Sequence, residues 1–416
     1  MVKTVDSYSK DFKLLILGQV ISIFGAVLLR FALSLYILDI TGRADRFATL
    51  YAISNIPILF SPVGGAIADR FNRRNLMVIL DFTSSSIAMC LFLLISAGLA
   101  TVMPIGAIMV LLSIVSAMET PTITASIPLL VETKKLEGAN GIAQAVQALS
   151  GVVAPILGGV LYSAFEIRIL VIITCIAFFL SAVMELFIKI PFARREWDGH
   201  IIASIVKDMK VGYVYAVKQS FILKSMIVAA VINLVLSPLL IVGGPIILRV
   251  TMQSSDTMQG IGIGLISFAS ILGTLIIGVF ANRIKMNTLY RLIAAIALFV
   301  VPIAVSVLPF ILELGYYPAF ALFMLGSLPI AIIAAIISIF VIARVQRVTS
   351  NENLGKVMAI LMAVGGCAAP LGQVIYGVIF EAFSNVLYFP ILAVSLLMFV
   401  IALVARRMFA AEPIIS

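Results

Sequence analysis

Two charged residues, Arg30 and Glu119, lie inside long apolar stretches of the chain. A charge at the centre of a lipid bilayer costs about 2.5 to 3.5 kcal/mol on insertion scales, so charges in such places mark functional sites. A carboxyl group in a poorly hydrated cavity can load and release protons near physiological pH. Glu119 is therefore the candidate for proton coupling, and the alternative is a structural hydrogen bond from Glu119 to a neighbouring helix.

Polar residues continue from both charges at helical spacing, three or four residues apart on one face. We expect these faces to line water. The candidates for a substrate cavity are Gln19, Ser22, Arg30, Ser116 and Thr122 on these faces, together with Asn233 in the seventh apolar stretch. Arg30 could attract an anionic group of a substrate, or pair with a residue that the sequence does not identify. Counted from the predicted ends of their helices, Arg30 and Glu119 differ in depth by roughly 15 Å, which argues against a direct salt bridge.

Asp81 and Glu185 lie close to the predicted ends of their apolar stretches. At such positions, snorkelling or pairing with nearby bases is commonplace, so we interpret both residues as structural. The one histidine, His200, lies outside the apolar stretches. Carboxylates must therefore carry any proton coupling.

The elements that hold these residues are predicted from composition. Of the 416 residues, 62% are hydrophobic and 11% are charged, and the mean hydropathy is +1.21, which is typical of a membrane protein. A helix needs about 20 apolar residues to cross a bilayer. Twelve such segments are predicted at about residues 12–38, 46–68, 75–98, 103–127, 139–165, 167–190, 221–248, 258–281, 289–310, 316–343, 354–380 and 385–407.

Most of the 28 lysines and arginines fall in the two termini and the even-numbered loops. Because basic loops stay in the cytoplasm, both termini are predicted to be cytoplasmic, with the chain in the cell (inner, cytoplasmic) membrane. The net charge of +9 does not indicate nucleic-acid binding, since the bases are spread over loops. Three cysteines at spacings that fit no metal site lead us to expect no metal and no cofactor.

Short motifs recur between the two halves of the chain. Gly65, Asp69 and Arg70 correspond to Gly278, Asn282 and Arg283, and Ala154-Pro155 corresponds to Ala369-Pro370 at a similar offset. Unless these matches are coincidental, they predict an N-terminal six-helix bundle (1–190), a cytoplasmic linker with an interfacial helix (191–220) and a C-terminal six-helix bundle (221–416).

The loop GAIADRFNRR, from Gly65 to Arg74, resembles the signature loop of the major facilitator superfamily, although Asn72 stands where that loop usually has glycine. The fifth segment, with Gly151, Pro155, Gly158 and Gly159, is similar to the proline-and-glycine motif of the antiporter branches of that superfamily. Gly18-Gln19, Thr41-Gly42 and Ala139-Asn140 are similar to its macrolide-efflux-like drug exporters.

The resemblance implies an all-α polytopic fold of twelve transmembrane helices in two pseudo-symmetric six-helix bundles. It also implies that Gly65, Asp69, Arg70, Arg73 and Arg74 form a conformational latch between the bundles on the cytoplasmic face. An exposed ion pair contributes only about 0 to 1 kcal/mol, so such a latch can open. The alternative is that these arginines only set topology, which leaves Asp69 unexplained.

These features predict a secondary active transporter that exports amphiphilic drugs or related small molecules by alternating access, in exchange for protons. An importer or a lipid or lysolipid flippase of the same fold is the alternative, because fold does not dictate substrate. No nucleotide-binding loop of the form GxxxxGK[ST] is present, so ATP is not the direct fuel. We expect a monomer with no enzymatic activity and no nucleic-acid partner.

Overall fold

A computed structural model describes residues 8–68, 71–191, 201–280 and 289–409 of the chain. Within these ranges the regular structure is helical, and they contain no strand. Twelve helical segments are long and apolar enough to cross a membrane, judged by length and composition. The predicted number and positions of the spans are thereby confirmed.

Contacts divide the chain into two compact units, each described separately below. Unit 1 comprises Met1–Leu33 and Ser54–Ile205, and unit 2 comprises Ser34–Ile53 and Val206–Ser416. The chain passes from unit 1 to unit 2 within the predicted linker. Ser34–Ile53, a segment from the first half of the sequence, packs with the second half.

Unit 1 contains the first part of a long first helix and seven further helical elements of the first half. Its elements are α1 (Lys10–Thr41, shared with unit 2), η1 (Ile56–Phe60), α3 (Ser61–Ala68), α4 (Arg73–Ser96), α5 (Val102–Leu130), η2 (Thr133–Lys135), α6 (Leu136–Ala164) and α7 (Ile167–Leu186). Asn72 begins α4 as its N-cap, because its side-chain oxygen accepts a hydrogen bond of 3.3 Å from the Asn75 amide. This explains the asparagine where the loop motif usually has glycine.

Unit 2 contains the end of α1 and the helices of the second half. Its elements are α2 (Ala44–Asn55), α8 (Ile201–Lys218), α9 (Ser220–Pro238), η3 (Leu239–Gly243), α10 (Gly244–Ile246), η4 (Ile247–Thr251), α11 (Asp256–Phe280), α12 (Leu289–Ser306), α13 (Pro309–Glu313), α14 (Tyr316–Val348), α15 (Asn351–Ala382), η7 (Ser384–Val386) and α16 (Tyr388–Phe409). Gly42 ends α1 with a φ of +60°, which glycine adopts without strain. Helix α8 lies where the linker helix was predicted.

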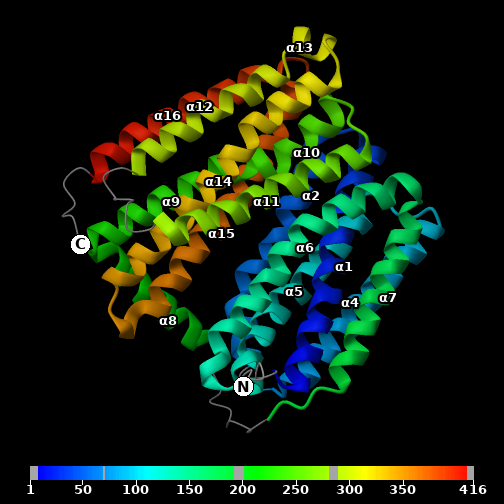
Figure 1. Ribbon diagram of the computed structural model, residues 1–416, viewed down its shortest axis with the longest axis vertical. Helices are drawn as coiled ribbons and strands as arrows, with labels where there is room; N and C mark the ends of the chain where they lie inside the picture. The colour runs from blue at the N-terminus through cyan, green and yellow to red at the C-terminus, as the bar shows by residue number, and fades with distance from the viewer. Residues whose placement is uncertain (1–7, 69–70, 192–200, 281–288, 410–416) are drawn as a thin grey trace, which may run out of the picture. The chain divides into compact units, whose positions relative to one another are not determined.

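Helix pairing repeats from one unit to the other. The third and sixth spans, α4 and α7, pack along each other in unit 1, as the ninth and twelfth, α12 and α16, do in unit 2 (Figure 1). A serine links each pair: Ser85 donates to the Cys175 carbonyl (3.0 Å), and Ser395 donates to the Ala297 carbonyl (2.7 Å). The repeated pairing agrees with the sequence repeat.

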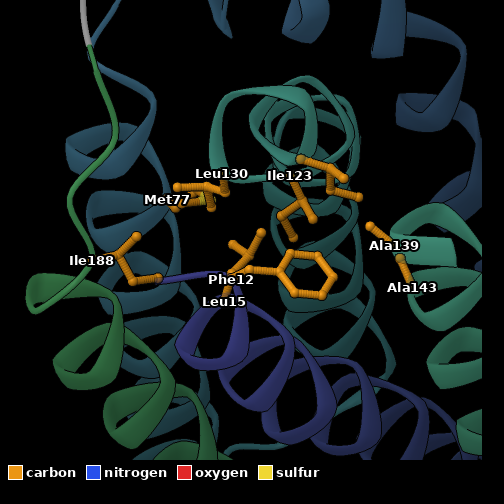
Figure 2. Close-up of a cluster of buried hydrophobic side chains, with 9 residues drawn as sticks. Phe12, Leu15, Met77, Ile123, Leu130, Ala139, Ala143 and Ile188 are labelled. Atoms are coloured by element: carbon orange, nitrogen blue, oxygen red, sulfur yellow. The ribbon is translucent and has the colours of Figure 1, made fainter. Parts of the chain in front are cut away.

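A cluster of buried apolar side chains holds the helices of unit 1 together near the start of α1 (Figure 2). Phe12 and Leu15 come from α1, Met77 comes from α4, and Ala139 comes from α6. The cluster is completed by Ile123, Ile127, Leu130, Ala143 and Ile188. Burial of this kind stabilises by about 1.5 to 3 kcal/mol per large side chain, so the cluster fixes the ends of these helices firmly.

Candidate functional site

Unit 1 encloses a cavity of about 370 Å³ between α1, α5 and α6. Polar side chains from all three helices face it, and they are Gln19, Ser22, Arg30, Ser116, Glu119, Thr120, Thr124, Asn140, Gln144 and Gln147. Ile123, Ile127 and Ala143 also line the cavity and belong to the apolar cluster of Figure 2. The apolar cluster therefore closes one end of a polar cavity.

Five residues singled out from the sequence meet in this cavity: Gln19, Ser22 and Arg30 on α1, and Ser116 and Glu119 on α5. Helical spacing brings them together, because each set repeats every three to eight residues along one face. Their contact with a substrate stays a prediction.

Glu119 is anchored to α1 by a hydrogen bond. The Ser22 hydroxyl lies 3.2 Å from Glu119 Oε1 and 2.9 Å from Asp81 Oδ1. Glu119 thus makes the structural hydrogen bond of the alternative interpretation, and it also lines the cavity. Both features are compatible with a carboxyl group that exchanges a proton with the cavity.

Arg30 lies eight residues, or about 12 Å, along α1 from Ser22, and it lines a second, smaller pocket together with Ser116 and Glu119. Its Nη1 donates to Asn55 Oδ1 over 3.5 Å, which is a long hydrogen bond. Among the described residues, Arg30 forms no ion pair, either with Glu119 or with another acid. A half-buried guanidinium without a carboxylate partner can therefore accept an anionic group from the cavity.

Two predicted cavity residues lie elsewhere. Thr122 is fully buried and donates to the Met118 carbonyl at 2.7 Å, so it does not line the cavity. Asn233 lines a separate cavity of about 250 Å³ inside unit 2, where its amide nitrogen bonds the Ala229 carbonyl. Apart from Asn233 and Ser338, the side chains of that cavity are apolar.

The cavity also contains polar residues that were not predicted to line it. Thr120 and Thr124 lie beside Glu119 on α5, and their spacing of four residues was available as a signal. Asn140, Gln144 and Gln147 line the cavity from α6, again at steps of four and three. Gln144 and Gln147 precede the glycine motif of α6, and their side-chain amides line the cavity.

Asp81 and Glu185 were interpreted as structural residues that snorkel or pair with nearby bases, and both of these causes were wrong. Neither side chain snorkels, since their exposed fractions are 0% and 2%. Neither pairs with a described base, and one carboxylate oxygen of each has no hydrogen-bond partner. Both helices turn these acids toward α1, and so away from the lysines near the helix ends.

The signature loop lies partly outside the described residues, which include neither Asp69 nor Arg70. Arg73 donates to the Ala68 carbonyl at 3.1 Å and to the Ala125 carbonyl at 2.9 Å, and Arg74 donates to the Leu186 carbonyl. These bonds join α3, α4, α5 and α7 inside unit 1. A latch role for the loop stays a prediction.

Close helix packing at this loop depends on Gly64 and not on Gly65. A Cβ added at Gly64 would lie 2.7 Å from the Ala117 carbonyl, whereas one at Gly65 would make only an ordinary contact of 3.7 Å with Pro121. Helix α3 therefore touches α5 through Gly64, the residue before the signature loop.

The glycine motif of α6 packs against α1 at one of its positions. A Cβ at Gly158 would lie 2.8 Å from Phe31 Cδ1, so the helices meet closely there. Gly159 and Pro155 are buried, whereas a Cβ at Gly151 would meet nothing within 4 Å. Pro155 interrupts the hydrogen bonding of α6 inside the helix.

Comparison with known proteins decides the family. Residues 15–341 match the sequence family described as the Major Facilitator Superfamily. The chain belongs to the major facilitator superfamily. Its members are transporters and not enzymes, and with twelve candidate spans the chain is a multi-pass membrane protein.

Relatives and solved structures of the superfamily agree with this assignment. The chain is 23% identical over 365 residues to Macrolide efflux protein A of Streptococcus pyogenes, covering 86% of each chain. A bacterial homologue of the iron transporter ferroportin has a TM-score of 0.70 at 18% identity, over 95% of this chain and 98% of that one. The POT family transporter PepTSo has a TM-score of 0.74 at 12% identity, over 97% and 98%.

Within the described residues, no group of three or more histidine, cysteine, aspartate or glutamate side chains could hold a metal ion. The cavity of unit 1 is lined by carboxyl, guanidinium, hydroxyl and amide groups. Groups of these kinds can form hydrogen bonds with a solute, and a carboxyl group can also exchange a proton.

Proposed function

We propose that this chain is a secondary active transporter that exports amphiphilic small molecules in exchange for protons, by alternating access. The relatives named as macrolide efflux proteins support export of such compounds. The cavity of unit 1 supports the chemistry, because it combines hydroxyls and amides with one acid and one base. Its partners are then small-molecule substrates and protons. The chain acts as a monomer in the cytoplasmic membrane, with both termini in the cytoplasm.

The position of Glu119 is the observation that carries this proposal. Its carboxyl group lines the cavity and is hydrogen-bonded to α1 through Ser22. In an antiporter, proton binding and substrate binding must exclude each other at least in part. A carboxyl group that shares a cavity with the substrate meets this requirement, because its charge changes the field that the substrate meets.

Arg30 gives the cavity a second, fixed charge. While Glu119 is ionised, the two charges partly cancel, and after protonation the cavity is left with the charge of Arg30. Cationic amphiphiles then bind better before protonation than after it. Loading of a proton at Glu119 therefore favours release of the substrate.

The test uses everted membrane vesicles with an imposed pH gradient. Uptake of a macrolide and of a cationic dye is compared between the parent chain and Glu119→Gln. We expect the variant to lose gradient-driven uptake and to keep downhill exchange of the substrate, since glutamine keeps the shape and removes the proton site. The control is Glu166→Gln, whose parent side chain is 77% exposed.

Unchanged gradient-driven uptake by Glu119→Gln would reject Glu119 as the coupling residue. Failure of the parent chain to accumulate either compound, in vesicles that hold a stable gradient, would instead reject proton-driven export. The two outcomes are separate because the second requires no variant.

A further inference from the structure

Three buried carboxyl groups surround one stretch of α1 in unit 1, and only one of them faces the cavity. The carboxyl array, as we name it, consists of Asp81 on α4, Glu119 on α5 and Glu185 on α7. Glu119 lines the cavity, whereas Asp81 and Glu185 are not among its lining residues. Two of the three acids therefore have no role in the function proposed above.

Hydrogen bonds and close contacts connect the array through α1. The Ser22 hydroxyl lies between Asp81 Oδ1 (2.9 Å) and Glu119 Oε1 (3.2 Å). One helical turn earlier, the Cβ position of Gly18 is 3.7 Å from Glu185 Cγ. The three carboxyl groups are thus within one or two turns of α1, about 6 Å apart along its axis.

Basic residues on the same helices are engaged elsewhere. Arg74, on α4, donates to the Leu186 carbonyl, and Arg73 donates to two backbone carbonyls. Lys189, which follows α7, is exposed, and Arg30 forms no ion pair with Asp81, Glu119 or Glu185. Helix α6 faces the cavity with uncharged amides. None of the described bases therefore neutralises the array.

Two acids of the array, and Gln19 on α1, have buried acceptor atoms with no donor. Asp81 Oδ2, Glu185 Oε2 and Gln19 Oε1 are all buried and have no hydrogen-bond partner. An ionised carboxylate is an acceptor only, whereas a protonated carboxyl group supplies one O–H donor. An ionised carboxylate with an unpaired oxygen away from water is costly, so burial favours the protonated form of Asp81 and Glu185. Like charges in one buried site also cannot all be ionised.

We propose that Asp81 and Glu185 form a proton store behind the cavity, connected to Glu119 by the hydroxyl of Ser22. In one step, protonated Glu119 gives its proton to Ser22 Oγ while the Ser22 hydroxyl proton moves to Asp81 Oδ1. Glu119 becomes ionised, Asp81 becomes neutral, and the serine is restored. Glu185, which packs beside Gly18 one helical turn away on α1, holds the second proton of the store. This inference rests on the proposed proton coupling at Glu119 and assigns two further residues to it.

The test measures protons and substrate together. The purified full-length chain is placed in vesicles loaded with a pH-sensitive dye, and proton flux is recorded beside macrolide flux for Asp81→Asn and Glu185→Gln. Both substitutions keep side-chain shape and lie outside the cavity, so macrolide affinity should stay within twofold of the parent. A positioned proton-transfer group contributes about 10²- to 10⁴-fold, so we expect proton flux to fall at least about 10²-fold. Glu166→Gln is the matched control.

A purely structural role gives different results. Loss of macrolide binding together with proton flux in both variants would overturn the proposal, as would proton flux equal to that of the parent. Ser22→Thr should keep proton flux and Ser22→Ala should lose it, which decides the matter if an acid variant does not fold. Coupling that requires sodium ions and no pH gradient would make the array a sodium site and overturn the proton store.

The result for Glu119→Gln separates this inference from the function on which it rests. If that variant loses coupling while Asp81→Asn and Glu185→Gln keep it, the proton store is wrong and the coupling role of Glu119 stands. If Glu119→Gln keeps coupling, the proposed function fails first.

Discussion

Helix α15 touches α2 in unit 2 through a glycine, and this contact offers a sharp test of alternating access. A Cβ added at Gly377 would lie 2.3 Å from the Cβ of Ala48 and 3.2 Å from the Cα of Asp45. Non-bonded carbons prefer separations of about 3.5 to 4.0 Å. Gly377→Ala must therefore push α2 away from α15 by at least about 1 Å.

The contact matters because α2 and the end of α1 come from the first half of the chain, whereas α15 comes from the second half. Glu381, on α15, also accepts a hydrogen bond of 2.8 Å from the Ala44 amide at the start of α2. If the two halves separate during transport, these contacts must break. Gly377→Ala then favours the state in which Ser34–Ile53 has left α15.

Overpacking of this kind costs about 1 to 3 kcal/mol. Replacing a helical glycine by alanine also stabilises a helix by about 1 kcal/mol, but α15 is helical before and after separation, so this gain cancels. A difference of 1 to 3 kcal/mol corresponds to roughly a 5- to 150-fold shift in the equilibrium. We expect a shift of that size toward the separated state.

The assay is labelling of Ala52→Cys by a membrane-impermeant maleimide on intact cells. Ala52 is on α2 and is 1% exposed, so a cysteine there reacts only when the segment separates. The native Cys90, Cys175 and Cys367 are replaced first, because two of them are exposed. Gly377→Ala should raise the labelling rate by the factor given above.

Two further variants identify the cause. Gly151→Ala adds the same methyl group to a helix where nothing lies within 4 Å, and it should leave labelling unchanged. Ala48→Gly removes the clashing Cβ and should restore slow labelling in combination with Gly377→Ala. Equal labelling of the parent and Gly377→Ala, or no rescue by Ala48→Gly, would refute the reasoning.

Four other substitutions test packing, an ion pair and the loop. Gly64→Ala should lower the free energy of unfolding by about 1 to 3 kcal/mol in thermal denaturation, whereas Gly65→Ala should leave it near the parent value, because only the first meets a backbone within 3 Å. Arg249→Gln removes two hydrogen bonds to Asp39, of 2.7 and 3.1 Å, and should raise maleimide labelling of α2 about fivefold, as expected for a partly exposed pair worth about 1 kcal/mol. Asp69→Asn should change the ratio of inward-open to outward-open forms measured by cysteine accessibility, and an unaltered ratio counts against the latch.

The twelve spans could be predicted because hydropathy and length determine them almost independently of packing. The cavity faces of α1 and α5 could also be predicted, because helical periodicity alone places Gln19, Ser22 and Glu119 on them. Thr122 shows the limit of this approach. A helix turns about 100° per residue, so a stripe of polar residues covers a wide arc, and only the packing of α3 and α4 on α5 decides which part of that arc is closed.

The partners of Asp81 and Glu185 could not be predicted for a related reason. Counting residues from a helix end gives the depth of a side chain but not the neighbour that it faces. Glu185 is next to the last residue of α7, and Asp81 is inside α4, yet both helices turn these acids inward to α1, where Gly18 and Ser22 are small enough to admit them. The choice between lipid, loop and neighbouring helix depends on pairwise packing, which the sequence of one helix does not contain.

The two units repeat the same helix pairing and yet differ in chemistry. The cavity of unit 1 holds an acid, a base and several amides, whereas the cavity of unit 2 holds Asn233 and Ser338 among apolar side chains. Binding a proton requires a titratable group, whereas binding the apolar part of a solute requires none. In a repeated fold, proton coupling can therefore reside in one half and contact with apolar solutes in the other. On this argument, substitutions that abolish coupling should cluster in unit 1, and substitutions that change substrate preference alone should include Asn233 and its apolar neighbours in unit 2. The test is random mutagenesis in which each variant is scored for proton coupling and for substrate preference. Equal numbers of coupling losses from the linings of the two cavities would contradict this division.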